Sequence, residues 1–246
     1  MRAILSTVLV FFSFCLSADT IFGVYAGAGT WQQEFSGDVA SGVADIDIRD
    51  DLDLGDKANN VFYLALEHPI PLLPNIRLQH AEIAVTGDST LTRSIDFNGS
   101  TFVVTDDIST SVTLDQSDAV FYYEVLDNVI SLDLGLAVRQ IEAEFAVTSS
   151  TEFARAEYEG VLPLLYAKVR GDLPFTGSWI SVQVQALAYD GNRLVDATLS
   201  VGWESSIGFG VEGGYRAFQL ELDDVDDISS ASLNVSGPYA AINFHF

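Results

Sequence analysis

The sequence is poor in cysteine and in basic residues. Its 246 residues include a single cysteine, Cys15, in the first apolar segment, so the rest of the chain has no disulfide bond, thiolate nucleophile or sulfur-based zinc site. Only 11 Lys and Arg oppose 35 Asp and Glu, which gives a formal net charge of −24. Binding of nucleic acid through its phosphates requires clustered positive charge, so that class of function is excluded.

Long apolar runs and helical periodicity are also absent beyond the first segment. No later stretch approaches the roughly 18 apolar residues of a membrane-spanning helix, and no window keeps the i, i+3, i+4 spacing of an amphipathic helix. The chain is nevertheless 48% hydrophobic with a mean hydropathy of +0.26, which excludes intrinsic disorder. A chain that is both acidic and apolar must separate these two characters in its fold.

The first 18 residues have the layout of a secretory signal peptide. A short positive segment, Met1-Arg2, precedes an apolar core over 3–16 and a small residue, Ala18, at the expected cleavage point. An N-terminal membrane anchor is the alternative, but the apolar run is short and no positive flank follows it. We therefore expect residues 19–246 to form one exported domain, as in a bacterial envelope protein without disulfides.

The remaining sequence alternates with a period of two. From Ile130 to Val138 the even positions are all apolar, whereas the odd positions are polar, charged or small, and similar runs cover 180–188, 195–204 and 207–216. These runs are about ten residues long, the length that a tilted strand needs to cross a bilayer, whereas soluble strands usually have about five or six. The pattern predicts an all-β, transmembrane, antiparallel up-and-down β-barrel rather than the alternative, a soluble sandwich.

The connections between the runs predict ten strands. The expected strands are 20–36, 57–68, 75–97, 100–126, 129–147, 153–170, 177–190, 193–204, 206–222 and 228–246. Tight turns, several with proline, alternate with mostly longer polar loops, and in such barrels the short turns face the periplasm. An even strand number places both termini there. Eight strands is the alternative, if some outer hairpins lie beyond the membrane.

The third predicted strand breaks the alternation. Its apolar residues occupy even positions first and odd positions later: Ile76 and Leu78, then Ala81, Ile83 and Val85. Either a β-bulge near Gln79-His80 shifts the register or the later part lies partly outside the bilayer, and we expect the bulge.

The chain ends on an alternating strand whose last residue is phenylalanine. One face carries Ala240, Ile242, Phe244 and Phe246. This arrangement resembles the C-terminal signature that the outer-membrane assembly machinery recognises in its barrel clients. We therefore expect that machinery to be a partner of the chain.

Three segments resemble an outer-membrane β-barrel family of Gram-negative envelope proteins that is named for its Gly-Gly motif. They are Leu66-Glu67-His68-Pro69-Ile70-Pro71-Leu72-Leu73-Pro74-Asn75, Asp118 with Tyr122-Tyr123-Glu124, and Glu212-Gly213-Gly214-Tyr215-Arg216. The resemblance covers most of the predicted mature chain. It implies a barrel fold and a cell outer-membrane location, surrounded by outer-membrane lipid and lipopolysaccharide, but it brings no catalytic residues or cofactors.

Few residues offer catalytic or metal chemistry. The three histidines, His68, His80 and His245, all fall outside the predicted outer loops, so we expect no catalytic residue, metal or cofactor. The alternative is a hydrolase, either a protease or a lipid-modifying enzyme, with a site at the extracellular rim. The acidic loop 45–56 predicts a two-sided strand extension projecting into water. Weak binding of divalent cations there or at 223–227, bridging to lipopolysaccharide, is a further hypothesis.

Charged residues recur on the predicted inner face of the strands. We expect these side chains to line the lumen: Glu67, Glu124, Asp133, Arg139, Lys168, Arg170, Asp196, Glu212 and Arg216. Buried charges must be paired, so an ion-paired plug is one interpretation, and a water-filled path for ions is the other. The sequence therefore predicts a non-enzymatic barrel, either structural or a narrow passive channel for ions or small solutes.

Overall fold

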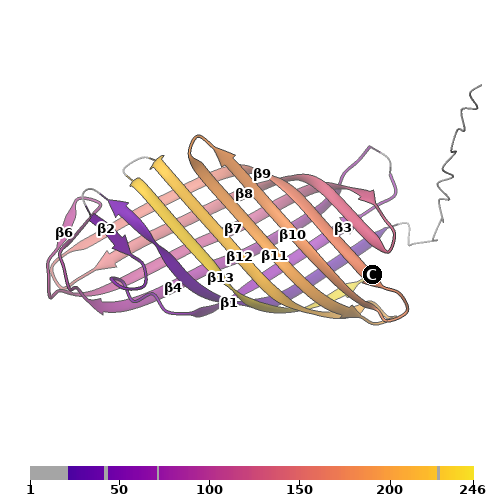
Figure 1. Cartoon of the computed structure of the whole chain (residues 1–246), viewed down its shortest axis with the longest axis horizontal. Coiled ribbons are helices and arrows are strands. Elements are labelled where there is room, and N and C mark those ends of the chain that lie inside the picture. The colour runs from indigo at the N-terminus through magenta and orange to yellow at the C-terminus, as the bar shows by residue number, and fades with distance from the viewer. Residues whose placement is uncertain (1–21, 42–43, 71, 226–227) are drawn as a thin grey trace, which may run out of the picture.

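The computed structural model describes residues 22–41, 44–70, 72–225 and 228–246 (Figure 1). The predicted signal peptide, including Cys15, lies outside these residues. Within the described ranges, no helix is long and apolar enough to cross a membrane.

Ten antiparallel strands form a closed barrel, in which each strand pairs with its neighbours in the sequence and the last pairs with the first (Figure 1). These strands are β1 (Gly23–Ser41), β3 (Lys57–Glu67), β4 (Asn75–Thr90), β7 (Asp107–Leu126), β8 (Ile130–Thr148), β9 (Phe153–Leu173), β10 (Ser178–Tyr189), β11 (Asn192–Glu204), β12 (Phe209–Val225) and β13 (Ile228–His245). The predicted fold class and the strand number of ten are confirmed.

Three short strands lie outside this ring. Strand β2 (Ala44–Asp47) pairs with the end of β1, and β5 (Ile95–Phe97) with β6 (Ser100–Phe102) forms a separate hairpin. The expected strands 75–97 and 100–126 are therefore too long, because β4 ends at Thr90 and β7 begins at Asp107. Asn98 and Gly99 do form a tight turn, both with positive φ, but this turn closes the small hairpin instead of joining two barrel strands.

The two ends of the barrel differ. The C-terminus and the connections from β3 to β4, β7 to β8, β9 to β10 and β11 to β12 lie at one end, which we call the turn end (Figure 1). The opposite end, which we call the loop end, carries β2 and the β5–β6 hairpin. The two longest connections, from β1 to β3 and from β4 to β7, both lie at the loop end, although the connections β8–β9, β10–β11 and β12–β13 at that end are short.

The apolar side of the wall changes from the outside to the inside along the barrel. On the outward face of β8, exposed Leu136 and Val138 are followed toward the loop end by Gln140 and Glu142. On the inward face, Arg139 is followed by Ile141, and both are buried. Because a regular strand alternates its side chains, this change needs no break in the backbone.

The same change explains the third predicted strand, where the expected β-bulge is wrong. Strand β4 pairs with β7 without interruption from Asn75 opposite Tyr122 to Thr90 opposite Asp107. Its odd positions point inward throughout, so Ile83 is fully buried in the loop-end half of the barrel. The register shift that the structure does contain lies in β7, between Glu124 and Leu126.

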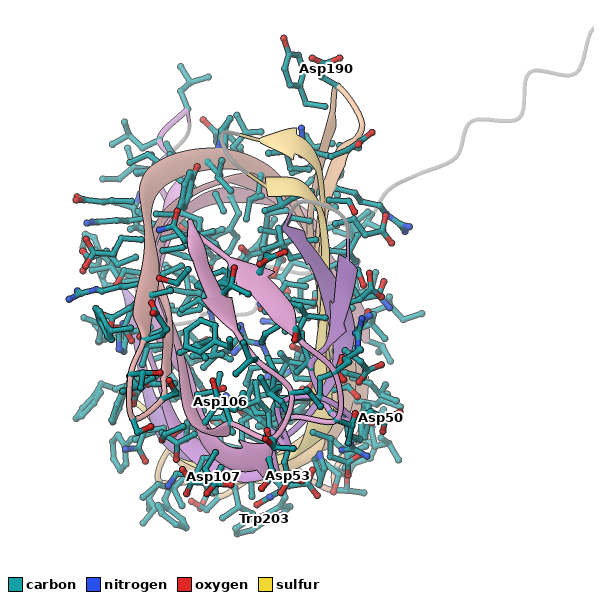
Figure 2. The ribbon with its side chains drawn as sticks, turned by 90° about the vertical axis from the view of Figure 1, so that its left-hand side faces the viewer. Asp50, Asp53, Asp106, Asp107, Asp190 and Trp203 are labelled. Carbon is teal, nitrogen blue, oxygen red and sulfur yellow. The ribbon has the colours of Figure 1, made fainter. Side chains whose placement is uncertain are left out.

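The loop-end half has a hydrophobic core of its own, and the acidic loop 45–56 contributes to it. The buried apolar side chains of this loop and of the β5–β6 hairpin pack together with the inward side chains of the barrel: Ile46, Ile48, Leu52, Leu54, Ile95, Phe97 and Phe102. Asp50 and Asp53 of the loop are exposed at this end (Figure 2). The expectation of a two-sided extension into water is therefore wrong, because the apolar half of the loop is buried.

A glycine permits this packing. A Cβ atom built on Gly87 of β4 would lie 2.5 Å from the carbonyl oxygen of Leu52, so the loop backbone crosses the strand where no side chain stands in its way. The acidic loop is thus held against the inside of the wall by both shape and apolar contact.

Replacing Leu52 with alanine tests this loop-end core. The side chain is fully buried, so Leu52→Ala should destabilise the packed loop by roughly 2–5 kcal/mol through lost contact and a residual cavity. Trypsin cleavage after Arg49 and Arg93, followed by mass spectrometry on the folded protein, should accelerate by more than tenfold. Leu72→Ala removes the same atoms from an exposed turn-end position and should leave the cleavage rate unchanged. Equal rates for both variants would show that the loop is not anchored by its apolar residues.

Candidate functional site

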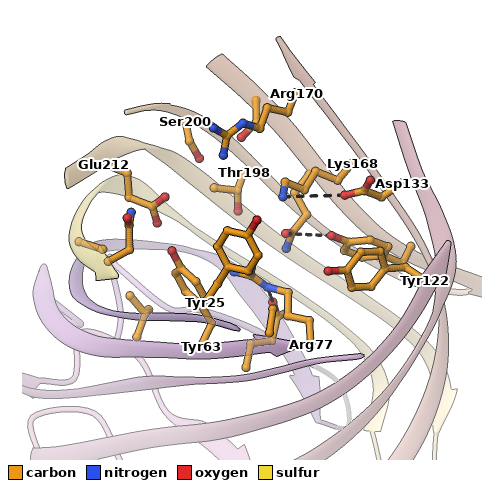
Figure 3. Close-up of a pocket in the computed structure, with 18 of the residues that line it drawn as sticks. Tyr25, Tyr63, Arg77, Tyr122, Asp133, Lys168, Arg170, Thr198, Ser200 and Glu212 are labelled. Carbon is orange, nitrogen blue, oxygen red and sulfur yellow. Dashed lines mark hydrogen bonds and ion pairs between the residues drawn. The ribbon is translucent and has the colours of Figure 1, made fainter. Parts of the chain in front are cut away.

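The turn-end half of the lumen encloses a cavity of about 370 Å³ (Figure 3). Its lining extends from Asp127 and Asp172, beside the turns, to Asp118 and Asp196 in the middle of the barrel. The barrel wall surrounds this cavity and lines it with many charged and polar side chains, which makes it the candidate site.

The structure brings most of the predicted lumen residues together here. Eight of the nine line the cavity: Glu67, Glu124, Asp133, Lys168, Arg170, Asp196, Glu212 and Arg216. The ninth, Arg139, is fully buried and contacts two of the acidic side chains in the middle of the barrel.

Several lining residues escaped the sequence reasoning. Arg77 on β4 points inward, as its position between exposed Ile76 and Leu78 could have indicated. Five tyrosines also line the cavity: Tyr25, Tyr63, Tyr122, Tyr166 and Tyr239. An aromatic residue near a strand end does not reveal which face it occupies unless the strand register is fixed, so the sequence did not indicate that these tyrosines point inward.

Arg139 is the centre of an ion-pair network that crosses the lumen. Its guanidinium donates two hydrogen bonds of 2.7 Å to Asp118, one of 2.9 Å to Asp196 and one of 3.1 Å to Gln185. Asp118 lies on the neighbouring strand β7, but Asp196 lies on β11, three strands away in the ring. One side chain thus joins separate parts of the wall through the interior.

A second arginine completes the network. Arg216 donates hydrogen bonds of 2.9 and 2.6 Å to the two oxygens of Asp196, and its guanidinium lies 4.6 Å from the ring of Trp31. Gln79 donates to Asp118 at 2.6 Å. Two guanidinium groups thus face two carboxylates, and the balance of charge and hydrogen bonds makes their burial tolerable.

An apolar layer lies beyond the network, toward the loop end. Large side chains from many strands fill the lumen there, and all of them are buried: Trp31, Phe35, Leu164, Leu194, Phe218 and Val235. The ion pairs and this layer together occupy the middle of the barrel, so the cavity has a blind inner end.

The charges nearer to the turn end have local partners. Lys168 lies 3.8 Å from Asp133 (Figure 3), and Arg170 donates to Asp172 at 2.8 Å while it stacks on Trp179. Two further carboxylates accept from uncharged groups, since Tyr122 donates to Glu67 at 2.7 Å and Asn75 donates to Glu124 at 3.2 Å.

The three histidines lie away from the loop end. His68 is in the β3–β4 turn, where its Nε2 lies 3.2 Å from the Pro74 carbonyl oxygen, and His245 stacks on Tyr25 near the turn end. His80 is on the outer wall, and its Nδ1 lies 3.1 Å from the hydroxyl of Ser117. Neither nitrogen of His80 contacts a carboxylate among the described side chains, so no histidine–carboxylate pair is available there to activate a nucleophile.

The acidic loops hold their charges through local contacts. Arg93 donates to Asp51 at 2.5 Å, and this hydrogen bond holds the pKa of the Asp51 carboxyl below its usual range. Arg49 pairs with Asp56 at 3.2 Å. Among the described residues, no group of three or more acidic, histidine or cysteine side chains could hold a metal ion, and Asp226 and Asp227 lie outside these residues. Weak cation binding at these loops stays a prediction.

The C-terminal strand has the two faces that its alternation predicted. Ile242 and Phe246 are exposed on the outer wall, whereas Tyr239, Ala241 and Asn243 line the cavity. Recognition of Ala240, Ile242, Phe244 and Phe246 by the assembly machinery stays a prediction.

Comparison with known proteins supports the fold and leaves the family open. No protein-family model and no curated protein matches the sequence. Among solved structures, the chain is similar to the outer membrane protease OmpT from Escherichia coli, with a TM-score of 0.50 and 12% identity over 92% of this chain and 96% of that chain. The translocator domain of the autotransporter NalP from Neisseria meningitidis gives a TM-score of 0.46 and 12% identity over 91% and 88% of the two chains. The likeness concerns the barrel fold alone.

Removing the central arginine tests the network. Arg139→Ala leaves Asp118 and Asp196 buried without their shared partner, so the free energy of unfolding should fall by roughly 3–5 kcal/mol. The measurement is reversible urea unfolding in lipid vesicles, followed by tryptophan fluorescence. Arg155→Ala removes an exposed arginine that pairs with Glu144 and should cost at most about 1 kcal/mol. A loss for Arg139→Ala no larger than that of the control would contradict a structural role for the network.

Proposed function

We propose that the protein is a non-enzymatic barrel of the bacterial outer membrane, in which it has a structural role and a closed lumen. The observation that carries this proposal is the filling of the lumen by the Arg139 network and by the apolar layer next to it. A barrel of this width can be either open or filled, so the identity of the inward side chains decides between the two.

A belt of exposed apolar side chains supports the location in a membrane. The outward residues of the turn-end half include Phe62, Leu64, Leu78, Leu136, Val138, Leu165, Ile180, Val182, Leu199, Val201 and Ile242. A soluble protein rarely exposes so continuous an apolar surface, whereas lipid covers such a surface without cost. Exposed Tyr123, Trp203 and Tyr215 add aromatic side chains of the kind found at bilayer interfaces.

The orientation follows from the connections. In outer-membrane barrels the short turns face the periplasm and the longer loops face outward, so the turn end is periplasmic and the loop end is extracellular in this proposal. The loop-end half, with its polar exterior and apolar interior, then stands above the bilayer as a water-exposed extension of the barrel.

A narrow passive channel has less support. Ions would have to cross both the Arg139 network and a layer that contains Trp31, Phe35 and Phe218, all of them buried. Burial of an ion in an apolar layer is costly unless it is paired, and this layer offers no free charged partner among the described residues.

A hydrolase at the extracellular rim also has less support. No histidine lies at the loop end, and His80 on the outer wall lacks a carboxylate to orient it. Catalysis by acidic residues alone would need converging carboxylates, whereas Asp47, Asp51 and Asp56 of the loop 45–56 contact arginine or backbone amide groups.

Planar-bilayer recording tests the closed lumen. Pure, folded wild-type protein should give no conductance steps, because two successive layers block the lumen. Arg139→Ala should also remain silent, since the apolar layer is intact in this variant. An open porin in the same bilayer serves as the positive control. Reproducible steps from the wild-type protein would overturn the proposal and favour the channel.

A further inference from the structure

We propose that the turn-end cavity binds a small zwitterion, a molecule that carries one carboxylate and one ammonium group and has the size of an amino acid. The inference goes beyond the structural role proposed above and rests on it only for the side from which the ligand enters. Two charged side chains of the cavity, Arg77 and Glu212, have no ion-pair partner among the described residues.

Arg77 is fixed in place and still has free hydrogen-bond donors. Its guanidinium lies 3.9 Å above the ring of Tyr63, and its Nε donates to Gln79 at 3.2 Å. No carboxylate lies within 4.0 Å of this guanidinium among the described residues, so both terminal nitrogens remain available. A stacked guanidinium with a free outer edge suits the two parallel hydrogen bonds of a ligand carboxylate.

Glu212 is the complementary group. No hydrogen bond and no ion pair within 4.0 Å joins its carboxylate to another described side chain. Five other acids near the turn end have partners, and Asp127 in the β7–β8 turn is exposed to solvent. The five are Asp133 with Lys168, Glu67 with Tyr122, Glu124 with Asn75, Asp172 with Arg170 and Glu204 with His245. A half-buried carboxylate without a partner favours an ammonium group as its ligand.

The topology places these two groups across the cavity from each other. Strands β4 and β12 are separated by β3, β1 and β13 on the shorter side of the ten-strand ring, so they stand on nearly opposite walls. Figure 3 shows Arg77 and Glu212 on different sides of the cavity, with Tyr25 and Tyr63 between them. No ion pair within 4.0 Å joins these two groups among the described residues, so a ligand that bridges them needs two charged ends.

The cavity has a suitable size and lining for such a molecule. Its volume of about 370 Å³ is near the lower end of small-molecule sites, and its inner end is closed by the Arg139 network. Tyr25, Tyr63 and Tyr239 also line the cavity, and their ring carbons offer apolar surface to a ligand side chain. The ligand enters from the turn end, which faces the periplasm in the proposed orientation.

Isothermal titration calorimetry of the folded barrel in detergent micelles tests this inference with three matched probes. L-Phenylalanine carries both charges, phenethylamine carries only the ammonium group, and 3-phenylpropionate carries only the carboxylate. We expect saturable binding of L-phenylalanine, at least tenfold tighter than that of either analogue, because each analogue loses one charged contact.

Two variants assign the contacts. Arg77→Gln should weaken L-phenylalanine by at least tenfold and leave phenethylamine unchanged, whereas Glu212→Gln should weaken L-phenylalanine and leave 3-phenylpropionate unchanged. Arg155→Gln and Glu159→Gln make the same changes on the exposed outer wall and should bind like the wild type. Each variant is first shown to fold by its shift on unheated gels. If Arg77→Gln fails to fold, Arg77→Lys replaces it. The lysine ammonium is a point charge that cannot make two parallel hydrogen bonds to the ligand carboxylate, so this variant should also bind L-phenylalanine more weakly and leave phenethylamine unchanged.

The inference is overturned by the absence of saturable binding for all three probes, by equal affinity for L-phenylalanine and phenethylamine, or by unchanged binding in both lumen variants. None of these results depends on conductance, so a channel-forming barrel that binds the zwitterion would overturn the proposed function alone. A silent barrel that binds no probe would overturn this inference alone.

Discussion

The apolar side chains of this barrel must be covered by an apolar environment, and this environment changes halfway along the long strands from lipid outside the wall to a protein core inside it. In the turn-end half the exposed wall requires lipid, while the interior holds charges and tyrosines. In the loop-end half the exterior is polar, and the interior is packed as in a soluble β protein. Strand β8 shows the change at one residue, because Arg139 points inward between outward Val138 and Gln140. The two requirements, lipid outside and a packed core inside, are thus met by different halves of the same strands.

The Arg139 network lies where these two interiors meet. A charged layer placed deeper in the apolar core would lack partners, and one nearer to the turn end would be solvated and weak. At the boundary, Asp118 and Asp196 supply the opposite charge, and together with Gln185 they accept hydrogen bonds from Nε and Nη2 of Arg139, while Arg216 completes the balance of charge. The network therefore separates a polar cavity from an apolar core. The same closure gives the cavity its blind end, which suits a ligand site better than a passage.

Much of the fold could be predicted from local alternation, and the errors have physical causes. The faces of β8, β10 and β11 follow from a period of two, which also placed Glu212 and Arg216 in the lumen. The bulge expected near Gln79 was wrong because the interior of a membrane barrel was assumed to be polar along its whole length. The acidic loop was misplaced for a related reason: Leu52 and Leu54 alternate with acids, but only the tertiary structure reveals a core for them to join. Arg77 was missed because the irregular pattern of β4 left its face undecided.

The most direct test of this account is the solvent around the outer wall of β8. Cys15 is the only cysteine in the sequence and precedes the described strands, so single cysteines introduced at 134, 136, 138, 140, 142 and 144 can each carry one spin label in lipid vesicles. The account predicts that labels at 134, 136 and 138 collide mainly with oxygen, and that labels at 140, 142 and 144 collide mainly with a water-soluble nickel chelate. Equal access of the nickel chelate to all six positions would contradict it, because lipid would then not cover the turn-end half.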